Sequence, residues 1–202
     1  AGMSSLTRDG FEPALLDLVV GWLDLTRVTD VVACGMVGAR QGWAEAEYAT
    51  VPGPPRGPQA FTRPRVRDGG IAVHILPGMR QDTPPDVMRG EETQILGAMA
   101  GGGSRCFVLP GTHSKWAWTT DGGIDRFSTY MTGELFSAIS LHSILAHAVE
   151  TGAPPTVDGK PFREGLASAL AAPTALTASL FRMRAAQLLG FEQRADGAAR
   201  LS

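Results

Sequence analysis

Short apolar runs typical of β-strands alternate along this chain with longer runs that have the spacing of amphipathic helices. The strand-like runs are 29–34, 71–76 and 106–109, and glycine or proline follows each of them directly. The helix-like runs are 13–24, 91–100 and 133–150, and the segment from residue 161 onwards predicts two more helices. This alternation predicts an α/β fold, in which ligands bind where loops leave the ends of the strands.

Three further segments have glycine or proline patterns typical of turns and loops. Residues 115–120 and 124–130 flank Asp121-Gly122-Gly123, a pattern that predicts a β-hairpin. The glycines at 101–103 are expected to end the helix that precedes them. The polar, proline-punctuated segment 51–68 predicts an irregular connection.

The composition is that of a globular protein, and it removes several classes of function. The 202 residues are 44% hydrophobic and 19% charged, with a formal net charge of −2, so nothing favours a nucleic acid or an anionic membrane surface as partner. No apolar run approaches the roughly 20 residues of a membrane span. No signal peptide is visible, and the apolar surroundings of Cys34 and Cys106 favour buried thiols in a reducing compartment. We therefore expect a cytoplasmic enzyme.

Three familiar catalytic signatures are absent from the sequence. Gly159-Lys160 is followed by Pro161, which is incompatible with a P-loop. The glycine run at 101–103 leads into Cys106 where a dinucleotide fingerprint needs its third glycine. No Gly-x-Ser-x-Gly elbow occurs. The chemistry must therefore be sought in other loops.

The first candidate loop follows the strand-like run 29–34 and reads CGMVGARQGW. Its glycines allow backbone amides to face a ligand. Arg40 has the fork geometry that matches a carboxylate, and Trp43 offers a flat wall for a sugar. The alternative is a glycine-rich turn with a surface arginine and a core tryptophan.

The second candidate loop, MRGEETQ, lies at the start of the predicted helix 91–100. Carboxylates in a first turn often do no more than complement the helix dipole. Two adjacent acids after Arg89-Gly90 exceed what a cap requires, so Glu91 or Glu92 is a candidate general base.

The third candidate loop, LPGTHSKW, turns from a strand through Gly111 and Thr112 into the predicted hairpin. A turn with hydroxyl groups and a lysine suits phosphate oxygens. An ordinary β-turn is the alternative explanation.

These loops, in this order, resemble the 2-dehydro-3-deoxygalactonokinase family over about residues 30–200. The stretches that carry the resemblance are GMVGARQGW, PGMRQD, VMRGEETQILGA, LPGTHSKW, MTGELF and the helical region Phe162–Gly190. The resemblance implies transfer of the ATP γ-phosphoryl group to the C6 hydroxyl of 2-dehydro-3-deoxy-D-galactonate, with ATP and Mg²⁺ as cofactors, in galactonate catabolism. The implied fold is the two-domain actin/hexokinase-like kinase. Residues 1–104 would then be a portion of the sugar-binding domain, and 105–202 the start of the nucleotide-binding domain.

The resemblance also assigns roles to the candidate loops. Related sugar kinases carry an acidic base on a helix N-terminus at this place, so the base role falls to Glu92 first and to Glu91 second, although those kinases usually have aspartate there. The residues implied at the ATP phosphates are Gly111, Thr112 and His113, with Ser114 and Lys115 close by. Those implied at the sugar acid are Gly35, Met36, Gly38, Arg40, Trp43 and Arg89. Of the two arginines, Arg40 is favoured for the substrate carboxylate, and no metal ligand is assigned within the chain.

The chain also departs from the pattern of such kinases. They open with a strand that bears an aspartate and a Gly-Thr turn, and they close with strands and a glycine turn that hold adenosine. Neither pattern is found here, so we expect the middle part of a longer kinase that lacks independent activity. The alternatives are a catalytically inactive sugar-acid-binding module and a kinase for another sugar acid. A homodimer also stays open.

Overall fold

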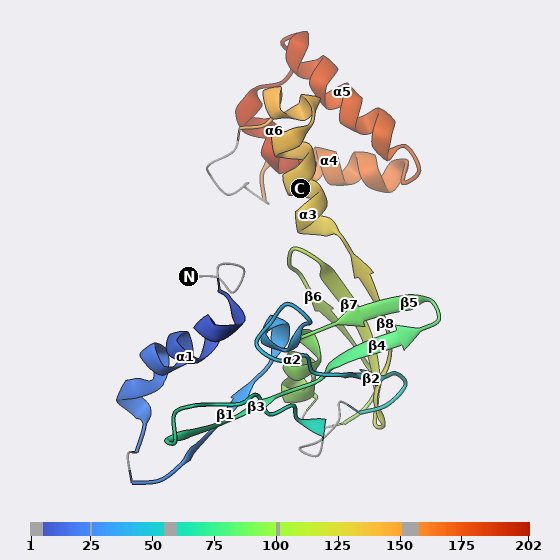
Figure 1. The fold of residues 1–202 in the computed structure, drawn as a ribbon. Coiled ribbons are helices and arrows are strands. Elements are labelled where there is room, and N and C mark those ends of the chain that lie inside the picture. The colour runs from blue at the N-terminus through green and yellow to red at the C-terminus, as the bar shows by residue number, and fades with distance from the viewer. Residues whose placement is uncertain (1–5, 25, 55–59, 100–101, 151–157) are drawn as a thin grey trace. The chain divides into compact units, whose positions relative to one another are not determined.

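The chain divides into a unit that contains all the described strands and a second unit that is helical (Figure 1). The computed structural model describes residues 6–24, 26–54, 60–99, 102–150 and 158–202. The first unit comprises Ala1–Pro110 and Ser114–Tyr130, and the second comprises Gly111–His113 and Met131–Ser202. The α/β class is thereby confirmed. The functional division into sugar-binding and nucleotide-binding parts stays a prediction.

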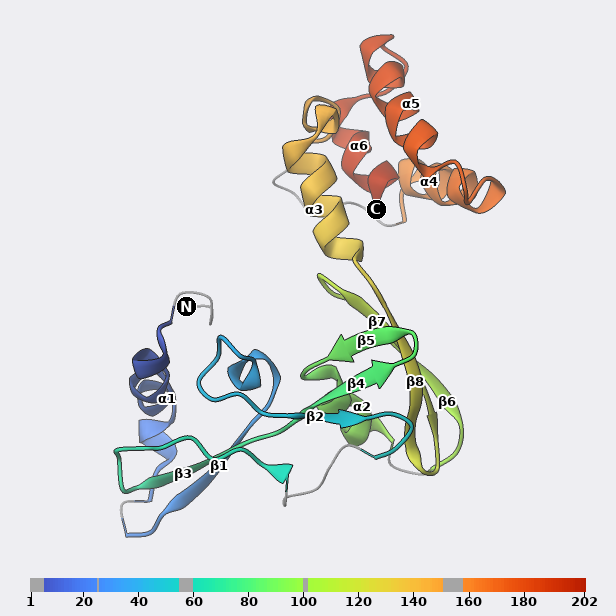
Figure 2. The same cartoon turned by 45° about the vertical axis from the view of Figure 1, so that its right-hand side comes forward.

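The first unit has three small sheets (Figure 2). In the first sheet β1 (Thr29–Ala33) runs parallel to β3 (Ile71–Ile75). In the second, β4 (Gly78–Asp82) pairs in parallel with β2 (Tyr48–Thr50) and antiparallel with β5 (Pro85–Met88). The third is the antiparallel meander of β6 (Arg105–Leu109), β7 (Ser114–Thr120) and β8 (Gly123–Tyr130).

The second and third sheets share a core with helix α2 (Glu91–Ala98). The buried residues of this core are Ala49, Val51, Met79, Met88, Ile95, Ala117, Ile124 and Phe127. The buried Gln81 side chain accepts a hydrogen bond from the Phe127 amide at 3.0 Å, which joins β4 to β8. Asp86 accepts hydrogen bonds from the amide and hydroxyl of Thr129 at 2.8 and 2.7 Å. Helix α2 is therefore fixed against both sheets, and with it the two acids at its N-terminus.

The parallel pair β1–β3 packs against the N-terminal helix. Helix α1 (Phe11–Val19) continues as a 3₁₀ turn over Val20–Trp22, close to the predicted helix 13–24. Leu15, Leu16 and Leu23 pack on the core of Ala46, Ile71, Val73 and Ile75 as their spacing predicts. Trp22 lies within the predicted helix 13–24, whose apolar spacing would place it on the packed face, but it is exposed, because α1 ends at Val19 and a 3₁₀ turn follows.

Two expectations about buried strands are corrected. β1 has one exposed face, since Asp30 and Val32 alternate with partly buried neighbours, and the exposed Cys34 continues that alternation. Cys106 is exposed as well, because it lies on β6, the edge strand of its sheet. Neither cysteine is therefore the buried thiol that its apolar neighbours predict.

The second unit contains four α-helices among its described residues: α3 (Thr132–His142), α4 (Lys160–Ala171), α5 (Leu176–Leu188) and α6 (Arg194–Leu201). The continuous helix expected over 133–150 breaks at Ser143, whose hydroxyl donates to the Ile139 carbonyl and accepts from the Leu145 amide. A 3₁₀ turn (Ile144–His147) follows. Beyond residue 161 there are three helices instead of the expected two. Residues 55–59, 100–101 and 151–157 lie outside the described residues, and with them parts of the predicted connection 51–68 and of the glycine run 101–103.

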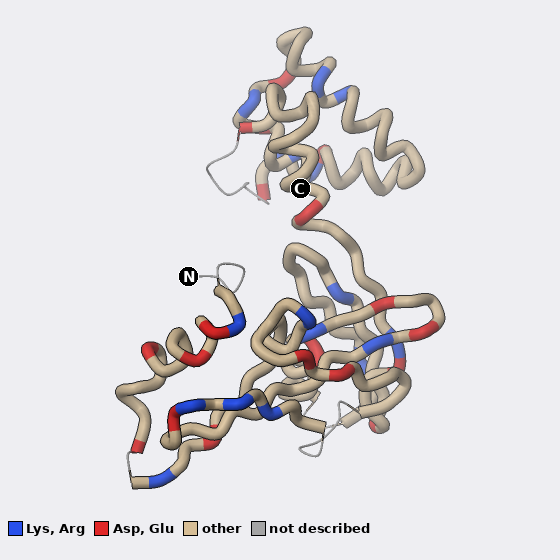
Figure 3. Tube along the Cα trace, viewed as in Figure 1, with Lys and Arg blue, Asp and Glu red and all other residues tan. Residues whose placement is uncertain are grey.

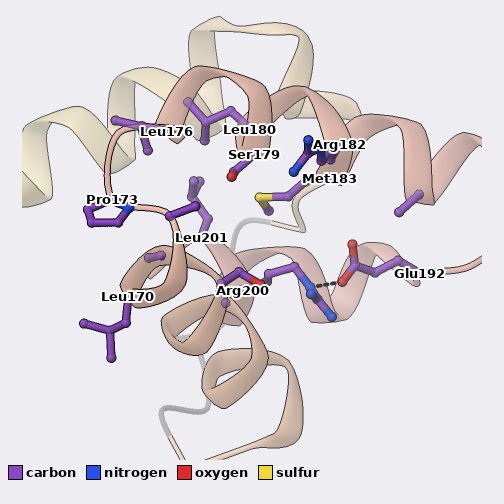
Figure 4. Close-up of a pocket in the computed structure, with 15 residues that line it drawn as sticks. Leu170, Pro173, Leu176, Ser179, Leu180, Arg182, Met183, Glu192, Arg200 and Leu201 are labelled. Carbon is purple, nitrogen blue, oxygen red and sulfur yellow. Dashed lines mark ion pairs between the residues drawn. The ribbon is translucent and has the colours of Figure 1, made fainter.

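Helices α4, α5 and α6 surround a cavity of about 540 Å³ with mainly apolar walls (Figure 4). Arg200 lies at its edge and pairs with Glu192 and with Glu164. None of the described helices combines the length and the apolar character that crossing a membrane requires.

Candidate active site

The first candidate loop folds back on itself after β1. Gly35–Gly38 form a 3₁₀ turn, and the Trp43 amide donates to the Val37 carbonyl at 2.9 Å. A Cβ atom placed on Gly42 would lie 2.3 Å from the Val37 oxygen, so only glycine fits at this position. Gly42 therefore serves the close turn of the loop itself.

The structure brings the first and second candidate loops together. Gly35 and Gly90 both have left-handed backbones, with φ of 82° and 113°. A Cβ atom on Gly90 would lie 3.3 Å from the Gly35 Cα, so the two backbones are in contact. A Cβ atom on Gly38 would lie 3.0 Å from Nη1 of Arg89. The absence of a side chain at Gly38 thus makes room for the Arg89 guanidinium.

Arg89 is enclosed, and part of its hydrogen-bonding capacity is unused. Its Nη2 donates to the Ala46 carbonyl at 2.8 Å, and its guanidinium carbon lies 4.2 Å above the centre of the Tyr48 ring. Nε and Nη1 are buried and have no hydrogen-bond partner among the described residues. A buried guanidinium with unpaired donors favours an anionic ligand.

Arg40 is in a different situation. Its side chain is 85% exposed, and its Nε lies 3.4 Å from the Glu45 carboxylate. Its backbone carbonyl accepts a hydrogen bond from Arg8 at 2.8 Å.

Trp43, in the same loop, is half-buried and stacks on Phe11, with ring centres 6.2 Å apart.

Glu92 is the most deeply buried acid of the candidate site, with 1% of its surface exposed. Its carboxylate accepts the Gly90 amide at 2.9 and 2.7 Å and the Thr93 hydroxyl at 3.1 Å. Burial raises the pKa of the Glu92 carboxyl above its ordinary value, although these hydrogen bonds act in the opposite direction. The buried Glu92 carboxylate therefore fixes the backbone of the turn at Gly90.

Glu91 connects the second candidate loop to the third. Its side chain is 24% exposed, one oxygen accepts the Arg89 amide at 3.1 Å, and the other lies 3.8 Å from Nζ of Lys115. Lys115 is a buried residue of β7. An acid and a lysine singled out in separate sequence motifs thus form an ion pair.

The turn Gly111–His113, just before β7 in the chain, is held by the N-terminus of α3. The Glu134 amide donates to the Thr112 carbonyl at 3.0 Å, and the His113 ring contacts the Glu134 carboxylate. A Cβ atom on Gly133 would lie 2.8 Å from the Gly111 oxygen. Among the described residues, no hydrogen bond uses the amides of Gly111, Thr112 or His113. These exposed amides are available to an anion.

Sequence reasoning assigned no role to MTGELF, the stretch that supports this turn. The signal that could have identified it is Gly133, a glycine in the first turn of a helix. Glycine is a poor helix former, so its presence there indicates close contact with another segment.

The raised pKa of Glu92 leads to a testable pH dependence. Since the folded state holds its proton more tightly than the unfolded state, this carboxyl's contribution to stability is complete at low pH. It is lost as the pH rises from about 4.5 through the higher folded-state pKa. Glu92→Gln cannot ionise, so the free energy of unfolding of wild type relative to this variant should fall over that window. Urea denaturation at a series of pH values measures the difference, and a difference constant with pH would contradict the assignment.

The described part of the chain offers no cluster of ligands for Mg²⁺. The described residues include no group of three or more histidine, cysteine, aspartate or glutamate side chains that could hold a metal ion. The Glu92 oxygens are already occupied by hydrogen-bond donors. We therefore assign no step to Mg²⁺.

Comparison with known proteins identifies the family. The model of the 2-keto-3-deoxy-galactonokinase family matches residues 1–202. A Rhizobium meliloti relative named 2-dehydro-3-deoxygalactonokinase is 40% identical over all of this chain and 66% of its own length. An Escherichia coli relative of the same name is 35% identical over 94% of this chain and 62% of its own.

The fold agrees with these matches. A crystal structure of a Sinorhizobium meliloti protein assigned the same name superimposes with a TM-score of 0.88 at 39% identity, over 100% of this chain and 67% of that one. The actin/hexokinase-like class expected from the resemblance is consistent with this match. This chain spans just under two thirds of the length of the curated relatives. The chain belongs to the 2-keto-3-deoxy-galactonokinase family.

Proposed function

We propose that this chain carries the acceptor-activating and phosphate-binding part of an ATP-dependent kinase for 2-dehydro-3-deoxy-D-galactonate. Family membership supports the substrate class. The observation that carries the chemistry is the ion pair between Glu91 and Lys115 at 3.8 Å. It brings a carboxylate that can accept a proton next to a cation that can attract phosphate oxygens, and phosphoryl transfer to a hydroxyl needs both.

In the proposed reaction the C6 hydroxyl oxygen of the sugar acid attacks the γ-phosphorus of ATP. The new bond joins O6 to phosphorus, the bond from phosphorus to the β–γ bridging oxygen breaks, and ADP leaves. The hydroxyl proton passes to a carboxylate of this chain. In the first unit, Lys115 would balance part of the negative charge of the phosphates. In the second unit, the amides of Gly111–His113, which no described residue uses, are suited to phosphate oxygens.

Of the two acids, we assign the proton to Glu91. A general base must contact the hydroxyl, and the Glu91 side chain is partly exposed whereas Glu92 is almost wholly covered. Glu92 is then a positioning residue, because its carboxylate holds the Gly90 amide and so fixes the turn that begins α2. This reverses the order that the resemblance implies.

We assign the substrate carboxylate to Arg89. Its Nε and Nη1 are unpaired and buried, while Arg40 is exposed and already paired with Glu45. The stack on Tyr48 and the bond to Ala46 hold the Arg89 guanidinium in place, so its donors are oriented before the ligand arrives.

Arg89→Lys should weaken sugar-acid binding by about 1–3 kcal/mol, because lysine keeps the charge but loses the fork of donors. Arg40→Lys, the matched variant in the neighbouring loop, should leave binding unchanged. Isothermal titration of the complete protein with 2-dehydro-3-deoxygalactonate measures both. Loss of affinity in Arg40→Lys alone would transfer the carboxylate to Arg40.

The same preparation tests the function itself. ADP release in the presence of the sugar acid and ATP supports the kinase. Sugar-acid binding without ADP release would indicate an inactive binding module. ADP release with a different sugar acid in a substrate panel would indicate a kinase for that other sugar acid. A cytoplasmic location and a homodimer stay predictions.

A further inference from the structure

A polar cavity lies in the first unit, and none of its lining residues has a role in the proposed reaction. Its volume is about 460 Å³, and its lining residues are Arg8, Asp9, Glu12, Trp43, Arg65 and Arg67. Neither Arg89 nor Glu91 lines it. Figure 3 shows basic positions following one another along the segment that leads into β3, which supplies two of these arginines.

The arginines of this cavity come from separate parts of the chain. Arg8 lies in the 3₁₀ turn before α1, and Arg65 and Arg67 lie two residues apart in the irregular segment before β3. All three arginines line the one cavity.

The two acids of the cavity, Asp9 and Glu12, offset only part of the charge of its three arginines. Glu12 uses one carboxylate oxygen to accept the backbone amides of Arg67 and Asp68, at 2.7 and 2.8 Å. Asp9 is exposed and lies 3.9 Å from Arg67, a separation at which a solvated pair contributes little. The lining therefore keeps a net positive charge.

The donors of two arginines are largely unused. Arg65 makes no hydrogen bond or ion pair with any described residue. Arg8 uses Nη2 for the Arg40 carbonyl, which leaves its other donors unassigned. Guanidinium groups that converge on one cavity with free donors are suited to a carboxylate or a phosphate group.

Trp43 gives the cavity an apolar wall. Its indole is held from behind by the near-parallel ring of Phe11, with an interplanar angle of 12°. A fixed aromatic face next to cationic donors suits a ligand that has both a carbon skeleton and an anionic group.

We propose that this cavity binds a small organic anion that carries a phosphate or carboxylate group, at a site separate from the candidate active site around Arg89. The ligand would touch Arg8, whose hydrogen bond holds the loop that also contacts Arg89 through Gly38. The inference does not depend on the kinase reaction, because binding is measured without turnover.

Calorimetric titration with inorganic phosphate, at constant ionic strength set by chloride, tests the proposal. Arg65→Ala removes a side chain that has no hydrogen bond or ion pair with any described residue, so folding should be unchanged, and thermal unfolding followed by circular dichroism checks this. Phosphate affinity should fall about tenfold or more, since a charge-assisted hydrogen bond is lost. Arg27→Ala is the matched control, because Arg27 is an exposed arginine of the same unit that pairs only with Asp24. The Arg27→Ala variant should bind phosphate with the affinity of wild type.

Two outcomes would overturn the proposal. Equal phosphate affinity in wild type and in a folded Arg65→Ala variant would place the anion elsewhere, for instance at the amides of Gly111–His113. The second arm titrates 2-dehydro-3-deoxygalactonate, whose affinity Arg65→Ala should leave unchanged. If Arg65→Ala lowers the affinity for the sugar acid as much as the affinity for phosphate, and phosphate competes with the sugar acid for binding, the cavity is part of the substrate site and not a separate one.

Discussion

Glu91→Gln should lower kcat of the complete protein by about 10²–10⁴-fold, the usual contribution of a positioned general base. Glutamine has nearly the same shape and keeps an acceptor for the Arg89 amide, so substrate binding should be retained. The fall should therefore be in kcat with KM for the sugar acid little changed, as steady-state kinetics can measure.

Glu92→Gln is the matched control for this experiment. Its side chain is buried against the Gly90 amide, and we expect a much smaller loss of kcat than at Glu91. A full loss of kcat in Glu92→Gln, together with near wild-type kcat in Glu91→Gln, would return the base to Glu92 and imply that the loop opens during the reaction.

Gly111→Val should raise KM for ATP about 10–100-fold, because a branched side chain would cover the free amides of the turn. The φ of Gly111 is not positive, so residues other than glycine can adopt this backbone. A Cβ atom there would meet only the His113 oxygen, at an ordinary 3.8 Å. The variant should thus fold normally, and any effect reports on the ligand.

Gly122→Val provides the comparison, because it lies in the turn between β7 and β8 and has similar space, with its nearest neighbour at 3.7 Å. Its KM for ATP should equal that of wild type. If the two variants behave alike, the turn at Gly111 is an ordinary β-turn and the phosphates bind elsewhere.

The sequence predicts the strands that have apolar, β-branched composition, and it misses those that do not. β1, β3, β6 and the β7–β8 hairpin were all expected near their observed bounds. β4 reads GMRQD and β5 reads PDVM, which contain too few apolar residues for a strand pattern. Their pairing depends on contacts far along the chain, such as Asp86 with Thr129.

For the candidate site, the sequence indicates which loops carry chemistry but not which side chains are free to act. Arg40 and Arg89 cannot be distinguished by residue type. Only the structure shows that Arg40 is paired with Glu45, whereas Arg89 has two nitrogen donors without a hydrogen-bond partner among the described residues. Glu91 and Glu92 are adjacent in sequence, yet packing buries one and leaves the other partly accessible. Burial of this kind is a tertiary property, and helix periodicity alone does not reveal it.

The contact between Gly35 and Gly90 limits how the substrate preference of this family member could be redesigned. A Cβ atom on Gly90 would lie 3.3 Å from the Gly35 Cα, and both glycines have left-handed backbones that other residues rarely adopt, so larger residues at these positions would strain the contact beside Arg89. Loop grafting at this point would therefore disturb the contact between the two loops. A library aimed at new acceptors should leave this glycine pair intact and vary Met36, an exposed side chain of the same turn.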